Sequence, residues 1–141
     1  MDTPPNGSTR TIISSRVSDD QERLRVLPRH FGPHMLIFED SVYVFMRHLS
    51  VEYRGGFWQF FELSNGGFYM APEVEPLHLR IDANGYDGRV SADAAGITAC
   101  LYALSHLSFG IDDECITRHY YRLRDFAAEH AEAIEIFAAI D

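Results

Sequence analysis

Histidine is the commonest metal ligand among protein side chains, and this sequence carries seven histidines. His30 and His34 stand four residues apart, a spacing at which two imidazoles on one helix can share a metal ion. Gly32 and Pro33 lie between them, however, and no glutamate completes an HExxH pattern. The sequence therefore predicts no metal site.

The side chains that could act as nucleophiles lack an activating pattern. Ser64 and Ser91 lie outside any GxSxG motif, the sharp turn that exposes a catalytic serine in many hydrolases. Cys100 and Cys115 form no CxxC pair, and helical periodicity predicts that both are buried, so we expect neither thiol to have a catalytic or metal-binding role. In the cytoplasm, the location expected below, both thiols would be reduced. Asp93 falls in the first turn of a predicted helix, where a carboxylate stabilises the helix dipole, and we favour that role over general-base catalysis. The sequence predicts no catalytic residue and no cofactor.

A glycine-containing tetrapeptide, SNGG, separates two aromatic runs in the segment WQFFELSNGGFYMAP at residues 58–72. A loop that cradles a phosphate is followed by the N-terminus of a helix, usually with a lysine at a fixed offset. Here Gly67 is followed instead by a strand-like run that ends at Pro72. Asn65 and Gly66 are typical of the central pair of a type I′ turn, in which both residues have positive φ. The sequence predicts a β-hairpin.

Four acidic side chains near the C-terminus would share one face of a helix, if that helix were continuous: Asp125, Glu129, Glu132 and Glu135. We call these four residues the acidic stripe. The chain ends at a further acid, Asp141. Acids at the C-terminal end of a helix oppose its dipole, at a cost of about a few tenths of a kcal/mol each. Two interpretations stay open: a solvated helix face, or a surface that docks a basic partner.

The charge of the chain limits the classes of partner. A formal net charge of −9 argues against direct binding to a phosphate backbone, because lysine and arginine supply that affinity. Mimicry of DNA would require a dense array of carboxylates, whereas the 21 acids are mixed with 12 bases, including Arg118, Arg122 and Arg124 beside the acidic stripe. We expect neither direct nucleic-acid binding nor full mimicry of DNA.

Length and composition predict one domain with a packed interior, since 46% of the 141 residues are hydrophobic. Residues 1–17 are rich in Pro, Ser, Thr, Asn and Gly, so we expect a flexible tail in front of a single domain of residues 18–141. The sequence has no apolar segment as long as a signal peptide or a membrane span. We therefore expect a cytoplasmic protein with no membrane partner.

Helical periodicity predicts helices on both sides of a strand-rich middle. One helix covers residues 18–27, is capped by its first residue and ends before Pro28, and the next covers residues 33–49. Ser91 is predicted to cap a third helix, and Asp112, Asp113 and Glu114 open a further helix that runs through Ala127. A last helical stretch carries Ile134 and Phe137. The third helix is expected to pack closely on its neighbours, because it begins with small residues: Ala92, Ala94, Ala95, Gly96 and Ala99.

Between these helices, alternation of period two predicts two hairpins, over residues 57–72 and 77–90. The order of helices, hairpins and helices contains no βαβ unit. The sequence therefore predicts an α+β fold, in which helices flank a small antiparallel sheet of three or four strands built from two hairpins.

Several segments together resemble the ArdB/KlcA antirestriction family: LPRHFG at 27–32, FWQFFELSNGGFYMAP at 57–72, SADAAGI at 91–97, RLRDFAAEH at 122–130 and IFAAID at 136–141. The resemblance implies a small cytoplasmic protein, commonly encoded on plasmids and other mobile elements. It implies an activity that relieves restriction of incoming DNA by type I restriction–modification systems. It implies no cofactor and no catalytic residue.

The resemblance leaves two hypotheses about how such a protein would act. In the first, the protein binds the restriction complex or a factor that controls it; in the second, it is an enzyme or regulator that alters the fate of that complex. An acidic interaction module of another purpose is a further alternative. The lack of a catalytic pattern favours binding to a protein partner, a subunit of a type I enzyme or its regulator. The candidate binding residues are the acidic stripe with Asp141 and, on the first hairpin, Trp58, Asn65 and Tyr69.

Overall fold

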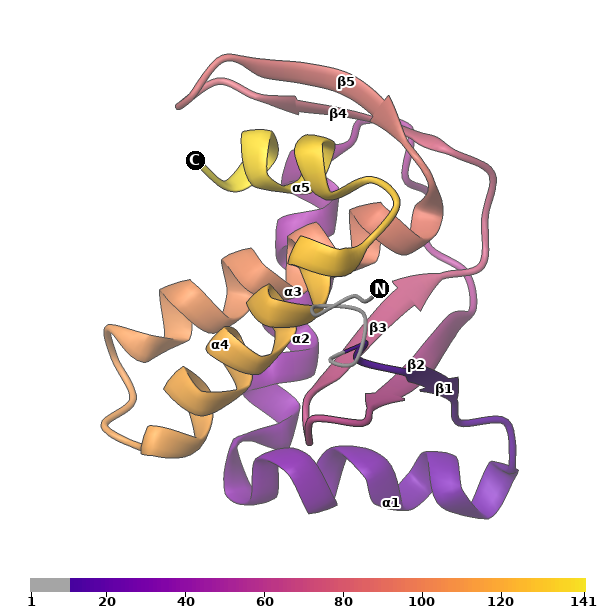
Figure 1. The fold of residues 1–141 in the computed structure, drawn as a ribbon, viewed down its shortest axis with the longest axis vertical. Coiled ribbons are helices and arrows are strands. Elements are labelled where there is room, and N and C mark those ends of the chain that lie inside the picture. Colours follow the sequence, from indigo (N-terminus) through magenta and orange to yellow (C-terminus); the bar gives the residue numbers. More distant parts are fainter. Residues whose placement is uncertain (1–10) are drawn as a thin grey trace, which may run out of the picture.

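The structure is a computed structural model that describes residues 11–141 (Figure 1). Strands and helices follow one another in the order β1 (Ser14–Arg16), α1 (Asp20–Phe31), a 3-10 turn η2 (Gly32–His34), α2 (Met35–Leu49), β2 (Trp58–Leu63), β3 (Phe68–Pro72), β4 (Leu77–Ile81), β5 (Tyr86–Val90), α3 (Ala92–Ser108), α4 (Glu114–Glu129) and α5 (Ala133–Ile140). None of the helices in this described part is both long and apolar enough to cross a membrane.

The strands form two antiparallel sheets, which confirms the α+β class and both predicted hairpins. The first sheet has the order β1-β2-β3, and the second consists of β4 and β5 alone. The hairpins therefore lie in separate sheets, whereas the sequence pattern suggested a shared one. Figure 1 shows the β4–β5 hairpin beyond α5, away from the first sheet. The proline-bounded connection at residues 73–76 takes the chain from one sheet to the other.

The first strand lies in a segment that was predicted to be a flexible tail, and this part of the prediction is wrong. Ser14 pairs with Leu63 and Arg16 with Phe61, and the Val17 N–H donates to the Phe60 carbonyl at 2.8 Å. The rest of the predicted tail, residues 1–10, lies outside the described residues. The residues of β1 have no hydrophobic pattern of their own, so this strand depends on the free edge that β2 offers.

Helix α1 differs from its prediction at both ends. Its N-cap is Asp19 rather than Ser18, and the Asp19 carboxylate accepts the Glu22 N–H at 3.0 Å. The helix also continues through Pro28 as far as Phe31. Pro28 leaves the carbonyl four residues earlier without its helical donor, and Leu24, at that position, is 74% exposed, so water can replace the donor. Burial of Phe31 favours the longer helix.

Helix α3 is the centre of the core, packing against α2, α4, α5 and strand β3. The Ser91 hydroxyl caps it by accepting the Ala94 N–H at 3.1 Å, as predicted. Its small residues bring it close to β3: a Cβ built on Gly96 would lie 2.5 Å from the Met70 carbonyl oxygen. The expected close packing of this helix is thus confirmed, and glycine is required at the contact with β3.

The SNGG segment is the predicted hairpin turn, but its geometry is not that of a type I′ turn. Gly66 has φ +91°. All residues with positive φ in the described chain are glycines, so Asn65 lacks the positive φ that a type I′ turn requires. The Gly66 N–H donates to the Leu63 carbonyl at 2.9 Å, and the Asn65 Oδ1 accepts the Gly67 N–H at 3.0 Å. The turn is thus closed by one left-handed glycine, an arrangement common in slightly longer hairpin loops.

Replacing Gly66 with valine is expected to lower the free energy of unfolding by about 1 kcal/mol or more, because a β-branched residue is strained at positive φ. Gly66→Asn is the matched control and should lose less, since asparagine enters this region more readily. Urea unfolding of both variants measures the difference. Equal losses would show that backbone conformation is not what requires glycine at this turn.

Candidate partner-binding site

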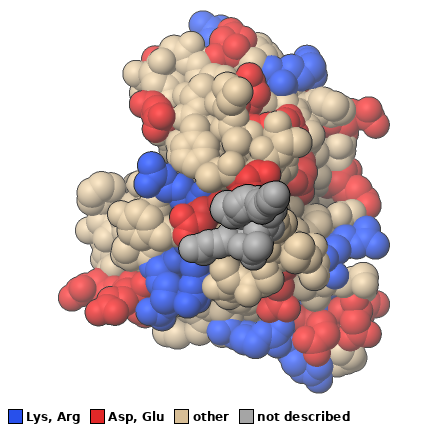
Figure 2. All heavy atoms as spheres, viewed as in Figure 1, with Lys and Arg blue, Asp and Glu red and all other residues tan. Residues whose placement is uncertain are grey.

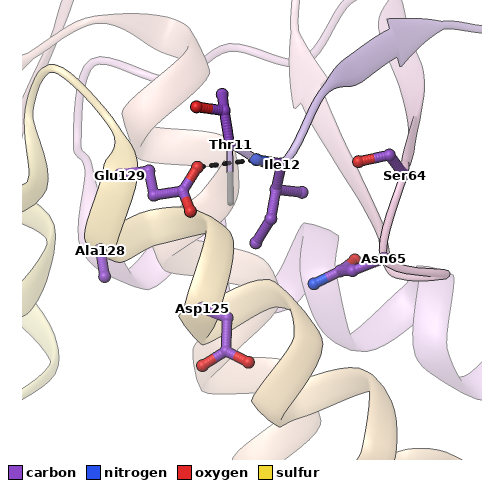
Figure 3. A pocket seen from close by; sticks show the side chains of 7 residues that line it. All are labelled: Thr11, Ile12, Ser64, Asn65, Asp125, Ala128 and Glu129. Carbon is purple, nitrogen blue, oxygen red and sulfur yellow. Dashed lines mark hydrogen bonds between the residues drawn. The ribbon is translucent and has the colours of Figure 1, made fainter. Parts of the chain in front are cut away.

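A surface pocket of about 610 Å³ lies between the start of the described chain, the β2–β3 turn and α4 (Figure 3). It is lined by Thr11, Ile12, Ser64, Asn65, Asp125, Ala128 and Glu129. Three of these, Asn65, Asp125 and Glu129, are among the binding residues proposed from the sequence. The fold thus brings together a hairpin residue and two helix residues that are about 60 positions apart in the chain.

The two carboxylates of the pocket differ in their contacts. Asp125 and Glu129 are one turn apart on α4. Glu129 accepts the Ile12 N–H at 2.8 Å and so fastens the segment that leads into β1 (Figure 3). Asp125 is exposed and forms no ion pair or hydrogen bond with any described residue. Asp125 is therefore the carboxylate that is available to a partner.

The hairpin side of the pocket is held rigidly. The Asn65 amide donates to the Arg122 carbonyl at 2.9 Å, in addition to accepting the Gly67 N–H. The Ser64 hydroxyl accepts the Ile13 N–H at 2.8 Å. Both polar side chains thus hold the turn against α4 and β1, so Asn65 shapes the pocket rather than offering free hydrogen-bonding groups. A rim that is already ordered lowers the entropy cost of binding.

The other two acids of the predicted stripe point elsewhere, because the C-terminal helix is not continuous. Helix α4 ends at Glu129 and α5 begins at Ala133, with extended backbone at His130. Glu132 accepts the Ser91 N–H at 2.9 Å and also the Ser91 hydroxyl. Glu135 accepts the Tyr86 hydroxyl. The prediction of one acidic helix face is therefore wrong, and these two carboxylates fasten α5 and the segment before it to α3 and β5.

The break between α4 and α5 is stabilised by a network that the sequence did not reveal. Asp93 accepts the buried Tyr69 hydroxyl at 2.7 Å and the His130 Nε2–H at 2.8 Å. The Glu132 N–H donates to the His130 Nδ1 at 2.9 Å, which fixes the tautomer of the ring. The Asp93 carboxylate raises the pKa of His130 above its usual value. Asp93 thus lies in the first turn of α3, as predicted, and also holds the α4–α5 connection.

The remaining sequence candidates do not reach the pocket. Trp58 is 4% exposed, and its indole N–H donates to the Tyr53 hydroxyl at 2.8 Å. Tyr69 is also buried, at 2% exposure. Both are core residues, so neither offers a surface. Asp141 is exposed at the C-terminal end of α5 (Figure 1).

The residues considered for metal or thiol chemistry are engaged in structural contacts. The His30 imidazole contacts Glu62 at 2.7 Å and the His34 imidazole contacts Asp113 at 2.9 Å, so the two histidines have separate partners. Within residues 11–141, no group of three His, Cys, Asp or Glu side chains is placed to hold a metal ion. Burial raises the pKa of the Cys100 thiol to about 12, which disfavours the reactive thiolate.

Charges of both signs occur on the face of the molecule that Figure 2 shows, where basic and acidic side chains lie near one another.

Comparison with known proteins identifies related chains over the same fold. The family profile described as "Antirestriction protein" matches residues 51–141. Antirestriction protein KlcA from Escherichia coli is 47% identical over 138 residues, which cover 92% of this chain and 94% of KlcA. Another Escherichia coli KlcA is 43% identical over 143 residues, which cover 96% of this chain and 99% of that protein.

A solved structure extends the similarity to three dimensions. It superimposes with a TM-score of 0.86 at 41% identity and covers all of both chains. That structure belongs to work on the KlcA and ArdB proteins, which describes a novel fold and antirestriction activity against type I DNA restriction systems in vivo but not in vitro. These findings confirm the resemblance seen in the sequence segments. The chain belongs to the antirestriction protein family.

Proposed function

We propose that this protein relieves restriction of incoming DNA by type I systems in cells, and that it does so by binding a protein. The observation that carries this proposal is the similarity, over the whole of both chains, to a structure from proteins with that activity. The activity of those relatives is present in vivo and absent in vitro. An inhibitor that needed only the nuclease would act in both settings. We therefore infer that the partner is a cellular factor that controls the restriction complex.

The pocket at α4 supports a protein-binding role. Asp125 is an exposed carboxylate without a partner among residues 11–141, and it faces a rim held by Asn65 and Ser64. A lysine or arginine from a partner that entered the pocket would pair with Asp125 in partial shelter from water. Complementary charges of this kind guide encounter and fix the register of two proteins.

Cells that carry a type I system should accept unmodified phage DNA more efficiently when they express this protein. Asp125→Asn is expected to reduce that relief by about tenfold, which corresponds to about 1.4 kcal/mol of binding free energy. Plating efficiency, measured at matched levels of soluble protein, tests both statements. Asp40→Asn is the control, because Asp40 is an exposed carboxylate on α2, and it should relieve restriction as well as the unchanged protein does.

Two results would contradict these expectations in different ways. Equal plating efficiency with and without the unchanged protein would refute the proposed activity. Full relief by the Asp125→Asn variant, together with activity of the unchanged protein, would leave the activity in place and remove Asp125 from the binding site.

A further inference from the structure

A second hollow lies at the other end of α4, where this helix packs on the end of α3. It has a volume of about 250 Å³ and is lined by Ser105, Ser108, Thr117, Tyr120 and Tyr121. A third hollow of about 320 Å³ follows the α3–α4 turn and shares Ser108 and Thr117 with the second. The two hollows therefore adjoin. Figure 1 shows the turn between α3 and α4 at the margin of the fold, away from both sheets.

One exposed face of α4 connects the second hollow with the pocket at Asp125. Thr117, Tyr121, Asp125 and Ala128 are all exposed and follow one another at intervals of four, four and three residues. At 3.6 residues per turn they share one face, and at 1.5 Å per residue they extend over about 16 Å. Thr117 and Tyr121 line the hollow at one end, and Asp125 and Ala128 line the pocket at the other. We call this face, with its four residues, the α4 strip.

The middle of the α4 strip has the composition of an interface anchor. Tyr121 is 54% exposed, and its ring meets Tyr120 edge to face, with the centroids 5.3 Å apart. Phe109, in the adjoining hollow, is 89% exposed. Tyrosine and phenylalanine are enriched at protein interfaces, since a rigid ring buries a large area at little entropy cost. An apolar side chain in this hollow would cover rings that now face water.

Two charges beside these rings specify the occupant further. Arg118, next to Thr117, is exposed and forms no ion pair with any described residue, as is also true of Asp125. The other arginines of α4 have contacts: Arg122 donates to the Gly66 carbonyl at 3.5 Å, and Arg124 lies over the Phe137 ring at 5.7 Å. A complementary surface therefore carries a carboxylate opposite Arg118 and a basic group opposite Asp125.

We propose that the α4 strip docks a single segment of the partner protein, which places an apolar side chain in the Tyr120–Tyr121 hollow, a carboxylate against Arg118 and a lysine or arginine against Asp125. The proposal rests on the proposed function, because it describes the partner that the antirestriction activity requires. Arg118 and Asp125 are seven positions apart, which corresponds to about 10 Å along the helix. Two turns of a partner helix or three residues of an extended strand span this distance.

The first test measures relief of restriction in cells for three single variants, Tyr121→Ala, Arg118→Glu and Asp125→Arg. Each should reduce relief by about tenfold or more, the effect of losing an interface anchor. Leu24→Ala is the control, because Leu24 is 74% exposed on α1, away from the strip, and it should keep full relief. Thermal unfolding of the purified variants checks that each remains folded, as expected for exposed positions.

The second test places the photo-crosslinking residue benzoylphenylalanine at position 121, 128 or 24 in cells that carry a type I system. Positions 121 and 128 should crosslink to the same segment of the same protein. Mass spectrometry should identify that segment, and its sequence should contain an apolar, a basic and an acidic residue. The basic and acidic residues should be separated by two helical turns or by three residues of a strand, which span about 10 Å. Position 24 should yield no such product. Crosslinks from 121 and 128 to different proteins, or to a second copy of this chain, would overturn the proposal.

The outcomes for the α4 strip and for the proposed function are distinguishable. If the unchanged protein fails to relieve restriction, the proposed function is wrong. If it relieves restriction and Asp125→Asn does not, while Tyr121→Ala and Arg118→Glu keep full relief, the proposed function stands and the strip is wrong.

Discussion

Replacing Gly96 with valine is expected to remove a large part of the free energy of unfolding. A Cβ at this position would lie 2.5 Å from the Ala71 Cβ and the Met70 carbonyl oxygen and 2.6 Å from the Ala71 Cα. These neighbours belong to the backbone and first side-chain atom of β3, so they cannot rotate away. Overpacking of a core costs about 1–3 kcal/mol and occasionally more, and the two further methyl groups of valine place this site at the upper end. The free energy of unfolding of a domain of this size is about 5–15 kcal/mol in total.

Gly96→Ala isolates the effect of the first atom. Alanine favours the helix by about 1 kcal/mol over glycine, so a net loss of stability would show that the contact with β3 outweighs helix propensity. Gly110→Ala is the matched control, because a Cβ there would meet nothing within 4 Å. Urea unfolding should give a clear loss for Gly96→Ala and little change for the control. An unchanged midpoint for Gly96→Ala would mean that the contact with β3 costs no more than the gain in helix propensity.

Acid should destabilise the fold through His119, before most carboxylates titrate. His119 is 4% exposed, its Nε2 lies 3.2 Å from the His30 carbonyl, and its Nδ1 has no hydrogen-bond partner among residues 11–141. Burial, and then the nearby charge of His30, lowers the pKa of His119 to about 4. The unfolded chain binds this proton near pH 6.5, so between pH 6.5 and 4 it holds more protons than the folded chain. Stability therefore falls as pH falls through this window.

The size of this effect follows from the two pKa values. Between pH 7.5 and pH 5, the folded state loses about 2 kcal/mol relative to the unfolded state through this one group. His119→Gln removes the titration while keeping an N–H donor for the His30 carbonyl. The unfolding free energy of the unchanged protein minus that of this variant should therefore decrease by about 2 kcal/mol when the pH falls from 7.5 to 5. A constant difference would assign the acid sensitivity to other groups.

His130 contributes in the opposite direction, which is why the comparison with the variant is needed. Its pKa is raised by Asp93, so the stability it adds is complete below the unfolded value and declines as pH rises through the folded value. Since Asp93 and His130 are unchanged in His119→Gln, their contribution cancels from the difference.

Local patterns predicted most of the elements. The alternation in residues 57–72 and 77–90, the cap at Ser91 and the spacing of apolar residues in α2 each depend on a few neighbouring residues, and the structure confirms them. The errors arose where residues far away in the sequence determine the local structure. Strand β1 forms because β2 provides a partner almost 50 positions later, and α1 passes Pro28 because Phe31 gains burial in the core.

The candidate site was less accessible to sequence reasoning, for the same reason. A helical projection of residues 125–135 assumed one continuous helix, whereas Asp93, from another helix, binds His130 and stabilises the break at that point. Trp58 and Tyr69 were chosen as aromatic surface residues, but their burial depends on α2, α3 and α4 covering the sheet. The pocket beside Asp125 requires three segments to meet, and no spacing along the chain predicts that.

The hydrogen bond from Ile12 to Glu129 joins the beginning of the described chain to α4, at a separation of 117 positions in the sequence. A ribosome makes the segment that becomes β1 long before it makes α4. During synthesis this segment can pair with β2 once the first hairpin has emerged, but its anchor on α4 is absent until α4 has also left the exit tunnel. The pocket beside Asp125 is therefore completed only after α4 has emerged, so shorter nascent chains cannot present it to a partner.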